Sequence, residues 1–458
     1  MSALLLILGL APAAEAFCGH YVGQAGSQIY NQSSQVVVVR QGEQTTLTLA
    51  NDVQGDTADF ALVMPVPQVL TADDVQTVDP EVLRALDAYS APRLVTYECE
   101  DFNYYSYSDG GGGSDSGTSG GEGDPATDGV VVEATFTEGE FLIQVLSADA
   151  AEPLVNWLNE NGYEMSPDAE TLLGEYISEG SYFVAARVIL DENAEAPTYL
   201  TPLQFTYTSS SFSLPIRLGT LNSQGVQDLI IYALTDYEKG AVAISNSAYP
   251  QLSVESDCMW RGSEEPEASF GGFYVEQLDA ALSGTAAGWL TEYSWATGGC
   301  DPCSGEPPTD EQVTRLGYAG GAGEAYFTRL HVRYTADGAT EDLMLYETNI
   351  QDFDQIKFIG YRYELEDRFP ICGEGMAEEP GSCDEAGGEG DASGGDDDGG
   401  SGSGSPVPDP NGFDLADTVK EPTGCAYGCA ASGDGAGGLA GLGLFAGLAL
   451  AARRRRSV

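Results

Sequence analysis

Positive charge is scarce in this sequence. It has 18 lysine and arginine residues against 72 aspartate and glutamate residues, which gives a formal net charge of −54 over 458 residues. A surface this acidic repels nucleic acid and anionic lipid headgroups, so nucleic-acid partners are excluded. The same surface would attract divalent cations weakly, which leaves calcium-dependent adhesion open; we expect no other cofactor.

Histidine is scarcer still, and the familiar catalytic motifs are missing. Two histidines, His20 and His331, cannot build a three-histidine zinc site and offer few choices of general base near neutral pH. The sequence has no Gly-x-Ser-x-Gly elbow between a strand and a helix, no Walker loop and no complete EF-hand loop. These absences favour binding or structure over catalysis, while leaving other kinds of enzyme open.

Nine cysteines suit an oxidising compartment better than the cytosol. We therefore expect structural disulfides. Two pairings suggest themselves, Cys372 with Cys383 across a loop that contains glycine and proline, and Cys18 with Cys99, although spacing alone fixes no connectivity. The full set of candidates is Cys18, Cys99, Cys258, Cys300, Cys303, Cys372 and Cys383.

Cys300-Asp301-Pro302-Cys303 is the motif that most favours a reaction. Two thiols at this spacing can lower each other's pKa at the start of a helix and act as a redox pair. A thioredoxin-like site would place a strand before the motif and a helix directly after it, whereas Gly298-Gly299 precedes it and residues 304–308 are typical of a loop. We expect a structural disulfide here. Thiol–disulfide chemistry, and metal binding with another cysteine such as Cys258, are the alternatives.

Residues 1–16 indicate a secretory signal peptide. Ala3–Ala13 is apolar but too short for a stable membrane span, and Ala14-Glu15-Ala16 is a small-x-small cleavage site. No lysine or arginine precedes the apolar run, which leaves an earlier true start open. Phe17 disfavours lipidation of Cys18, so we expect a plain cut.

Residues 425–458 have the composition of a sorting and anchoring segment. Gly435–Ala452 carries no charge, and as a helix it would be about 27 Å long, just enough to cross a bilayer core. Cys425 and Cys429 precede it, and a basic cluster of the kind found on the cytoplasmic side ends the chain at Arg453, Arg454, Arg455 and Arg456.

This order of cysteine motif, weak span and arginine cluster resembles the myxobacterial C-terminal sorting tag, MYXO-CTERM. The resemblance implies that a sorting protease cuts the tail near the cysteines and that Cys425 or Cys429 is lipidated, which would leave the protein on the outer surface. An ordinary single-span membrane anchor is the alternative.

Two low-complexity stretches divide the rest of the chain. Residues 108–129 and 382–405 are rich in glycine, serine and acidic residues and have no apolar run, so neither can bury enough surface to fold. We interpret 108–129 as a disordered acidic surface loop and 382–424 as a flexible stalk. Residues 17–381 would then form one extracytoplasmic body, with a subdomain split open near 200–250.

The body is predicted to be α+β, with mostly antiparallel strands and a few short helices. Gln35–Arg40 and Thr45–Ala50 indicate a hairpin, and Phe60–Val66 a third strand. Helices are expected over 80–89, from a cap at Ser147 to 161–162, from 166 to 177, and over 309–316 with a Thr309/Gln312 capping box. Further strands are expected over 141–146, 182–190, 203–207, 213–218, 228–235, 240–245, 326–334, 342–346 and 356–364.

His331 falls within one of these strands. Alternation places His331 and Arg333 on one face, which we interpret as a polar or interface face. The opposite, apolar face would carry Leu330, Val332 and Tyr334.

Several segments resemble a bacterial family called domain of unknown function 2330. They are residues 35–52, 60–67, 157–163, 300–303 and 328–334, which match in order and together extend the resemblance over about residues 17–372. The resemblance implies an exported bacterial protein with no established reaction, and it names no catalytic residues.

The sequence therefore favours an acidic protein exported to the cell surface or outer membrane, with a non-enzymatic binding or envelope-structural role and a ligand still to be named. An extracellular thiol–disulfide enzyme that uses Cys300 and Cys303, and a cation-dependent adhesin, are the alternatives.

Overall fold

The computed structural model describes residues 20–22, 29–55, 61–99, 129–161, 165, 168–188, 200–222, 225–262, 270–298, 306–349 and 351–383. The predicted signal peptide, nearly all of the acidic loop, the stalk beyond Cys383 and the anchoring segment lie outside these residues. So do several site candidates, namely Cys18, Cys300, Cys303, Cys425, Cys429, Arg453, Arg454, Arg455 and Arg456.

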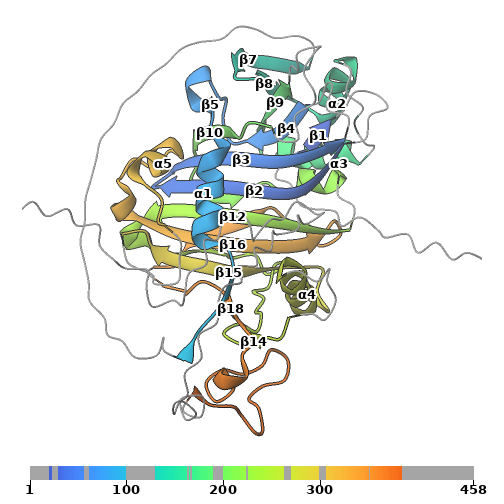
Figure 1. Ribbon diagram of the computed structural model, residues 1–458. Helices are drawn as coiled ribbons and strands as arrows, with labels where there is room; N and C mark the ends of the chain where they lie inside the picture. The colour runs from blue at the N-terminus through green and yellow to red at the C-terminus, as the bar shows by residue number, and fades with distance from the viewer. Residues whose placement is uncertain are drawn as a thin grey trace, which may run out of the picture.

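Two large sheets form the body (Figure 1). The first has seven strands in the order β15 (Ala287–Ala296), β16 (Ala325–Thr335), β12 (Val226–Asp236), β2 (Ile29–Gln41), β3 (Gln44–Gly55), β10 (Leu203–Thr208) and β5 (Val75–Thr77). The second has five, β1 (His20–Val22), β4 (Ala61–Val66), β9 (Tyr182–Val188), β8 (Phe141–Ala148) and β7 (Val130–Glu138). All neighbours in both sheets are antiparallel except β12 and β2.

The predicted hairpin is confirmed at β2 and β3, where Gly42 takes a φ of +61° in the turn. The run of four valines in β2 shows why this strand is central. Val36 and Val38 face one core, and Val37 and Val39 face another, so both faces of the strand are buried. A continuous apolar run is typical of such a strand. Strands that precede and follow residues 200–250 share this sheet.

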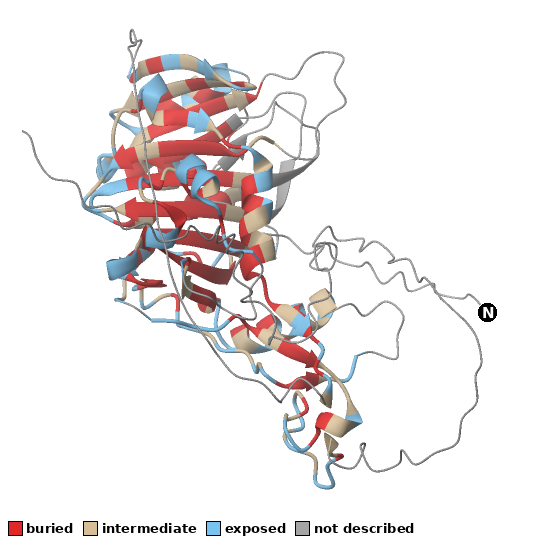
Figure 2. Cartoon of the chain, turned by 60° about the vertical axis from the view of Figure 1, so that its left-hand side comes forward, coloured by how far each residue is buried: buried red, intermediate tan, exposed pale blue. Residues whose placement is uncertain are grey.

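Helices cover the outer faces of the two sheets, and one core lies between the sheets (Figure 2). Helix α1 (Pro80–Ser90) and α5 (Asp310–Arg315) pack on the seven-stranded sheet, whereas α2 (Ala151–Glu160) and α3 (Ala169–Ser178) pack on the five-stranded sheet. Helix α4 (Phe270–Leu282) packs beside β15 through Tyr274 and Leu278. The fold is therefore α+β and mostly antiparallel, as predicted.

Two small sheets complete the body. One has the order β11 (Ser213–Leu214), β17 (Leu343–Glu347) and β13 (Val242–Ile244), and the other has β14 (Met259–Trp260), β18 (Lys357–Gly360) and β6 (Arg93–Val95) in parallel. Short 3-10 helices are found at Ala72–Asp74, Arg217–Asn222, Tyr237–Lys239, Ala322–Glu324 and Tyr363–Leu365. No helix in the part of the chain described above is long and apolar enough to cross a membrane.

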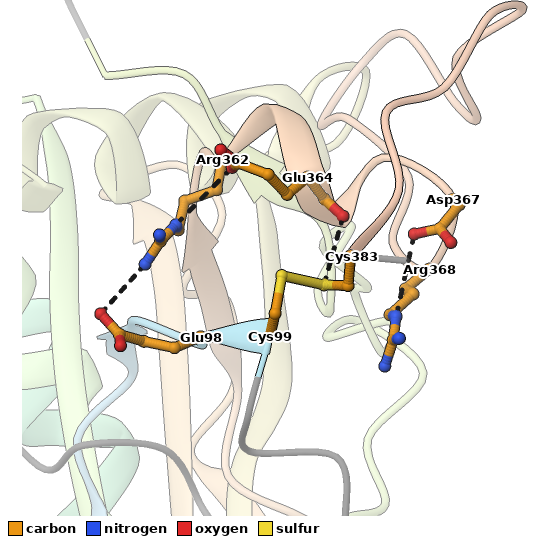
Figure 3. Close-up of a disulfide and its surroundings, with 7 residues drawn as sticks. All are labelled: Glu98, Cys99, Arg362, Glu364, Asp367, Arg368 and Cys383. Carbon is orange, nitrogen blue, oxygen red and sulfur yellow. Dashed lines mark hydrogen bonds and ion pairs between the residues drawn. A yellow bond between two sulfur atoms is a disulfide. The ribbon is translucent and has the colours of Figure 1, made fainter. Parts of the chain in front are cut away.

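Two disulfides close the small parallel sheet, Cys258–Cys372 and Cys99–Cys383. Figure 3 shows the second of them. The expectation of disulfide bonds is thus confirmed, but both expected pairings are wrong. Strands β6 and β14 flank β18, so residues distant in sequence come together there. The Cys372 amide donates to the carbonyl of Met259, which places Cys258 within bonding distance of Cys372 rather than leaving Cys372 to bridge the loop to Cys383.

Several expected boundaries also need correction. Helix α2 begins at Ala151, because Ser147 is still within β8 and its hydroxyl donates to Glu133 on β7. The strands expected over 213–218 and 356–364 are shorter and are each followed by a 3-10 helix. The Thr309/Gln312 capping box is confirmed. Strands β7 and β15 and helix α4 were not anticipated.

Candidate functional site

Strand β16 carries a row of cations on one face. The alternation predicted for His331 and Arg333 is confirmed, because Leu330, Val332 and Tyr334 lie in the core between the sheets. The expected polar face is not open to solvent or to a partner, however. Arg329, His331 and Arg333 are between 1% and 5% exposed, since α1 and α4 bring acidic and phenolic side chains over them.

A bulge in β15 supplies the carboxylate at the centre of this face. The register between β15 and β16 shifts between Thr291 and Tyr293. A bulge lets two successive residues face the same side of a sheet. Glu292 consequently contacts Arg329, while Tyr293 beside it packs against Tyr89 of α1 with ring centroids 5.2 Å apart.

These side chains form one continuous ion network that is buried at its centre and reaches the surface at its ends, Asp87 and Asp279. We define it as Asp87, Arg329, Glu292, His331, Asp228, Arg333 and Asp279. Arg329 joins Asp87 at 2.6 Å and Glu292 at 2.5 Å. His331 joins Glu292 through Nδ1 at 2.7 Å and Asp228 through Nε2 at 2.6 Å. Two tyrosines donate into it, Tyr274 to Glu292 and Tyr232 to Asp87.

The network fixes the charge of its central members. Burial alone would raise the pKa of Glu292, but Arg329 and His331 lower it to about 2. Burial alone would lower the pKa of His331, but the carboxylates of Glu292 and Asp228 raise it to about 9. His331 is thus protonated at neutral pH and donates from both ring nitrogens, so it has no lone pair with which to act as a general base.

A pocket of about 330 Å³ lies at the outer edge of β15, the terminal strand of the seven-stranded sheet. Trp289, Thr291 and Ser294 of β15 line one side, Val242 and Ala243 of β13 a second, and residues 346–349 and 351–353 a third. Trp289 belongs to the core between the sheets, whereas Glu292 faces the ion network. The pocket and the network therefore lie on different faces of β15.

Two segments cover the edge of β15 on either side of the pocket. The amide of Trp289 donates to Pro250 at 3.0 Å, and its carbonyl accepts from Leu252 at 2.6 Å. Further along, Ser294 and Phe353 exchange backbone hydrogen bonds of 2.9 and 2.8 Å. Thr291 lies between these covered stretches, so the pocket occupies the gap that they leave.

The carboxylate and amide side chains of the pocket fall into two groups. Asp352 accepts a hydrogen bond from Tyr326 at 2.7 Å, and Glu347 forms an ion pair with Lys239 at 3.1 Å. By contrast, three amide side chains make no hydrogen bond to the described residues, namely those of Gln251, Asn349 and Gln351. They are the donors and acceptors that a ligand could engage.

Asn349 has a backbone φ of +70°, which is uncommon outside glycine, although asparagine tolerates it better than most residues. Its carbonyl accepts from the amide of Ala241 at 3.2 Å, and the amide of Thr348 donates back to Ala241 at 2.8 Å. These bonds hold the turn in place at the rim of the pocket. Strained backbone of this kind concentrates at functional sites.

The structure thus separates the residues that the sequence singled out. His331 and Arg333 are in the ion network, and Cys99, Cys258, Cys372 and Cys383 are in the two disulfides. None of these six lines the pocket. Within the described ranges, no group of three or more His, Cys, Asp or Glu side chains is arranged to hold a metal ion, so the calcium alternative remains a prediction.

Comparisons with known proteins identify a family but not an activity. No curated protein is similar enough to count as a relative. Among solved structures, the crystal structure of baculovirus P35 shows 9% identity and a TM-score of 0.28, covering 71% of this chain and 98% of P35. The crystal structure of a mutated baculovirus P35 after caspase cleavage shows 10% identity and a TM-score of 0.29, covering 71% of this chain and 100% of the mutated P35 chain. At these TM-scores the similarity supports no conclusion about fold or function.

The family comparison is more extensive. The family described as "Uncharacterized protein conserved in bacteria (DUF2330)" matches residues 12–346. This range includes both strands of the first hairpin, the ion network and the residues that line the pocket as far as Tyr346. The match covers most of the chain. It ends at residue 346, earlier than residue 372, where the resemblance seen in the sequence ended. The chain belongs to this bacterial family of uncharacterised proteins.

Proposed function

We propose that this chain is an exported protein, held at the cell surface or outer membrane by its C-terminal segment, and that its β-rich body binds a ligand there without catalysing a reaction. The observation that carries the proposal is the pair of disulfides. They join cysteines 284 and 114 residues apart in the sequence. Bonds of this kind persist in oxidising compartments and are rare in the cytosol.

Binding is favoured over catalysis by the state of the polar groups. Both ring nitrogens of His331 are engaged, and the acids around it are paired with arginines. The pocket, by contrast, carries three amide side chains without hydrogen-bond partners among the described residues, those of Gln251, Asn349 and Gln351. Amides recognise hydrogen-bonding ligands well but are poor acids and bases.

Anchoring is supported by the sequence of the tail. Its cysteine motif, uncharged stretch and arginine cluster follow the order of the MYXO-CTERM tag. We propose that a sorting protease removes the arginine cluster and that a lipid on Cys425 or Cys429 retains the protein in the outer membrane. The acidic stalk 382–424 would then hold the body away from the lipid surface.

Mass spectrometry of the intact protein and its peptides, purified from the native host, tests the proposal. We expect loss of residues 1–16 and of Arg453–Arg456, with a lipid mass on Cys425 or Cys429. Comparison of Cys425→Ser with Cys429→Ser provides a matched control. The variant at the anchor should lose both the lipid mass and surface retention, and the other should keep both. An intact arginine end would refute sorting and leave a plain membrane span.

The same preparation tests the absence of catalysis by thiols. We expect Cys300 and Cys303 to be fully oxidised and resistant to mild reductant. Readily reduced thiols at these positions, with turnover of a model disulfide that is lost in Cys300→Ser, would refute the non-enzymatic proposal and establish thiol–disulfide exchange.

A further inference from the structure

The pocket at the edge of β15 presents aromatic side chains to solvent. Tyr346 is 46% exposed and Phe353 44% exposed, and both line the pocket. Trp289 contributes a third ring that is almost fully buried. Exposed aromatic rings gain free energy when an apolar face covers them, so the rim favours a ligand with a flat apolar face.

The hydrogen-bonding groups of the pocket favour a ligand with many hydroxyl groups. Each amide of Gln251, Asn349 and Gln351 offers both a donor and an acceptor, which matches a hydroxyl group that can do the same. The turn at Asn349 is held by its bonds to Ala241, so this amide starts from a fixed backbone position. Pre-organisation of this kind reduces the entropy lost on binding.

The charge of the pocket excludes an anionic ligand. Its charged lining residues are Glu347 and Asp352, and neither lysine nor arginine lines it. Glu347 already pairs with Lys239, whereas Asp352 keeps its negative charge while it accepts from the hydroxyl of Tyr326. We choose a neutral polar ligand because the unpartnered side chains of the pocket are uncharged amides, and a cationic ligand is the competing outcome of the test.

Size and access exclude an extended peptide. An added β-strand needs a continuous run of open edge. Residues 250–252 and 353 cover β15 on either side of Thr291, so only a gap remains. The volume of about 330 Å³ is at the lower end of the roughly 300–1,000 Å³ typical of ligand pockets. A small cyclic ligand fits these limits.

We propose that this pocket binds a neutral saccharide, with the C–H face of a sugar ring against Tyr346 or Phe353 and its hydroxyl groups bonded to Gln251, Asn349 and Gln351. This inference rests on the proposed function, because it names the ligand class of the binding body. The natural ligand would be a free sugar or part of a neutral polysaccharide at the cell surface. The two differ in the number of linked sugar units that contact the protein.

Titration calorimetry with the purified full chain tests the inference. The probes are glucose, galactose, mannose, N-acetylglucosamine, maltose, cellobiose and a soluble neutral glucan. Glucuronate and glucosamine serve as charged counterparts of glucose. We expect saturable binding of at least one neutral probe and weaker binding of glucuronate. Affinity that rises from monosaccharide to glucan indicates a polysaccharide source, and equal affinity indicates a free sugar.

Pocket variants locate the binding. We expect Tyr346→Ala and Phe353→Ala to weaken binding about tenfold, and Gln351→Ala to weaken it several-fold. Tyr237→Ala is the matched control, because Tyr237 is also 46% exposed but does not line the pocket. Its affinity should stay within about twofold of the unmodified chain, and unchanged thermal unfolding should show that each variant is folded.

Three outcomes would overturn the inference: no saturable binding of any neutral probe at its highest soluble concentration, binding of glucosamine alone with loss at high salt, or binding that all pocket variants retain. If the sugars fail while mass spectrometry finds the lipidated, oxidised form, only the ligand class is wrong. If that form is absent, the proposed function fails whatever the calorimetry gives.

Discussion

Glu292→Gln is the substitution that tests the buried ion network most directly. It keeps the shape of the side chain but removes the charge that faces Arg329 and His331. The pKa of Glu292 is lowered from 4.5 to about 2, which corresponds to about 3 kcal/mol at roughly 1.4 kcal/mol per unit. Removing one partner of a buried ion pair typically costs about 3–5 kcal/mol, which is of the same size. We expect a loss of about 3 kcal/mol in the free energy of unfolding.

Urea unfolding at neutral pH, followed by tryptophan fluorescence with the disulfides oxidised, measures this loss. Glu311→Gln is the matched control. Glu311 pairs with Arg315 on an exposed helix surface, with its side chain 74% exposed, so its loss should change stability by less than about 0.5 kcal/mol. If Glu292→Gln lowers stability by less than about 1 kcal/mol, Glu292 is not an ionised partner of Arg329 and His331, and the predicted role of the bulge in β15 is refuted.

Three further predictions follow from the same structure. The pKa of His331 is raised from 6.5 to about 9, so its stabilising effect is complete below pH 6.5 and is lost as pH rises to 9. The free energy of unfolding should fall between pH 6 and pH 9.5 by about 3 kcal/mol more in the unmodified chain than in His331→Gln, and an equal fall in both would argue against the ion pairs. Cys99→Ser/Cys383→Ser should lower stability by about 2–5 kcal/mol and speed proteolysis after residue 357, while the Cys258–Cys372 bond still forms; unchanged cleavage there would contradict the clamp on β18. Gly338→Ala would drive a Cβ into the backbone of Ala286 and should lower the thermal midpoint by an amount equivalent to about 1–3 kcal/mol. Gly174→Ala is the control on helix α3, where a Cβ would make only an ordinary van der Waals contact with Ala151 at 3.7 Å, and it should be neutral or slightly stabilising.

Local patterns in the sequence predicted much of the fold. Alternation identified the strand that holds His331, and the pair Thr309 and Gln312 identified the start of α5, because both signals depend on residues close together in the chain. Ser147 shows the limit of the same reasoning. A serine before an apolar helix is a good cap, but pairing with β7 keeps it in a strand.

Long-range partners could not be predicted. The two disulfides depend on β18 lying between β6 and β14, which no spacing of cysteines encodes. The cations of β16 suggested a polar surface because the sequence does not reveal that α1 and α4 cover it. The sequence did not indicate the pocket either. Its amides and aromatic residues come from separate loops and strands, and residues of these types are common in any sequence.

The ion network and the pocket are nevertheless connected through β15. The bulge that turns Glu292 toward Arg329 lies between Thr291 and Ser294, which both line the pocket. A bulge fixes the local twist and register of a strand, and here the buried charge of Glu292 opposes any slip that would move it from its partners. Arg329 and His331 of β16 both contact Glu292 of this strand, in a chain that has only 18 lysine and arginine residues. We infer that the network holds in register the strand that lines one side of the pocket, and a small-molecule binding site needs such support.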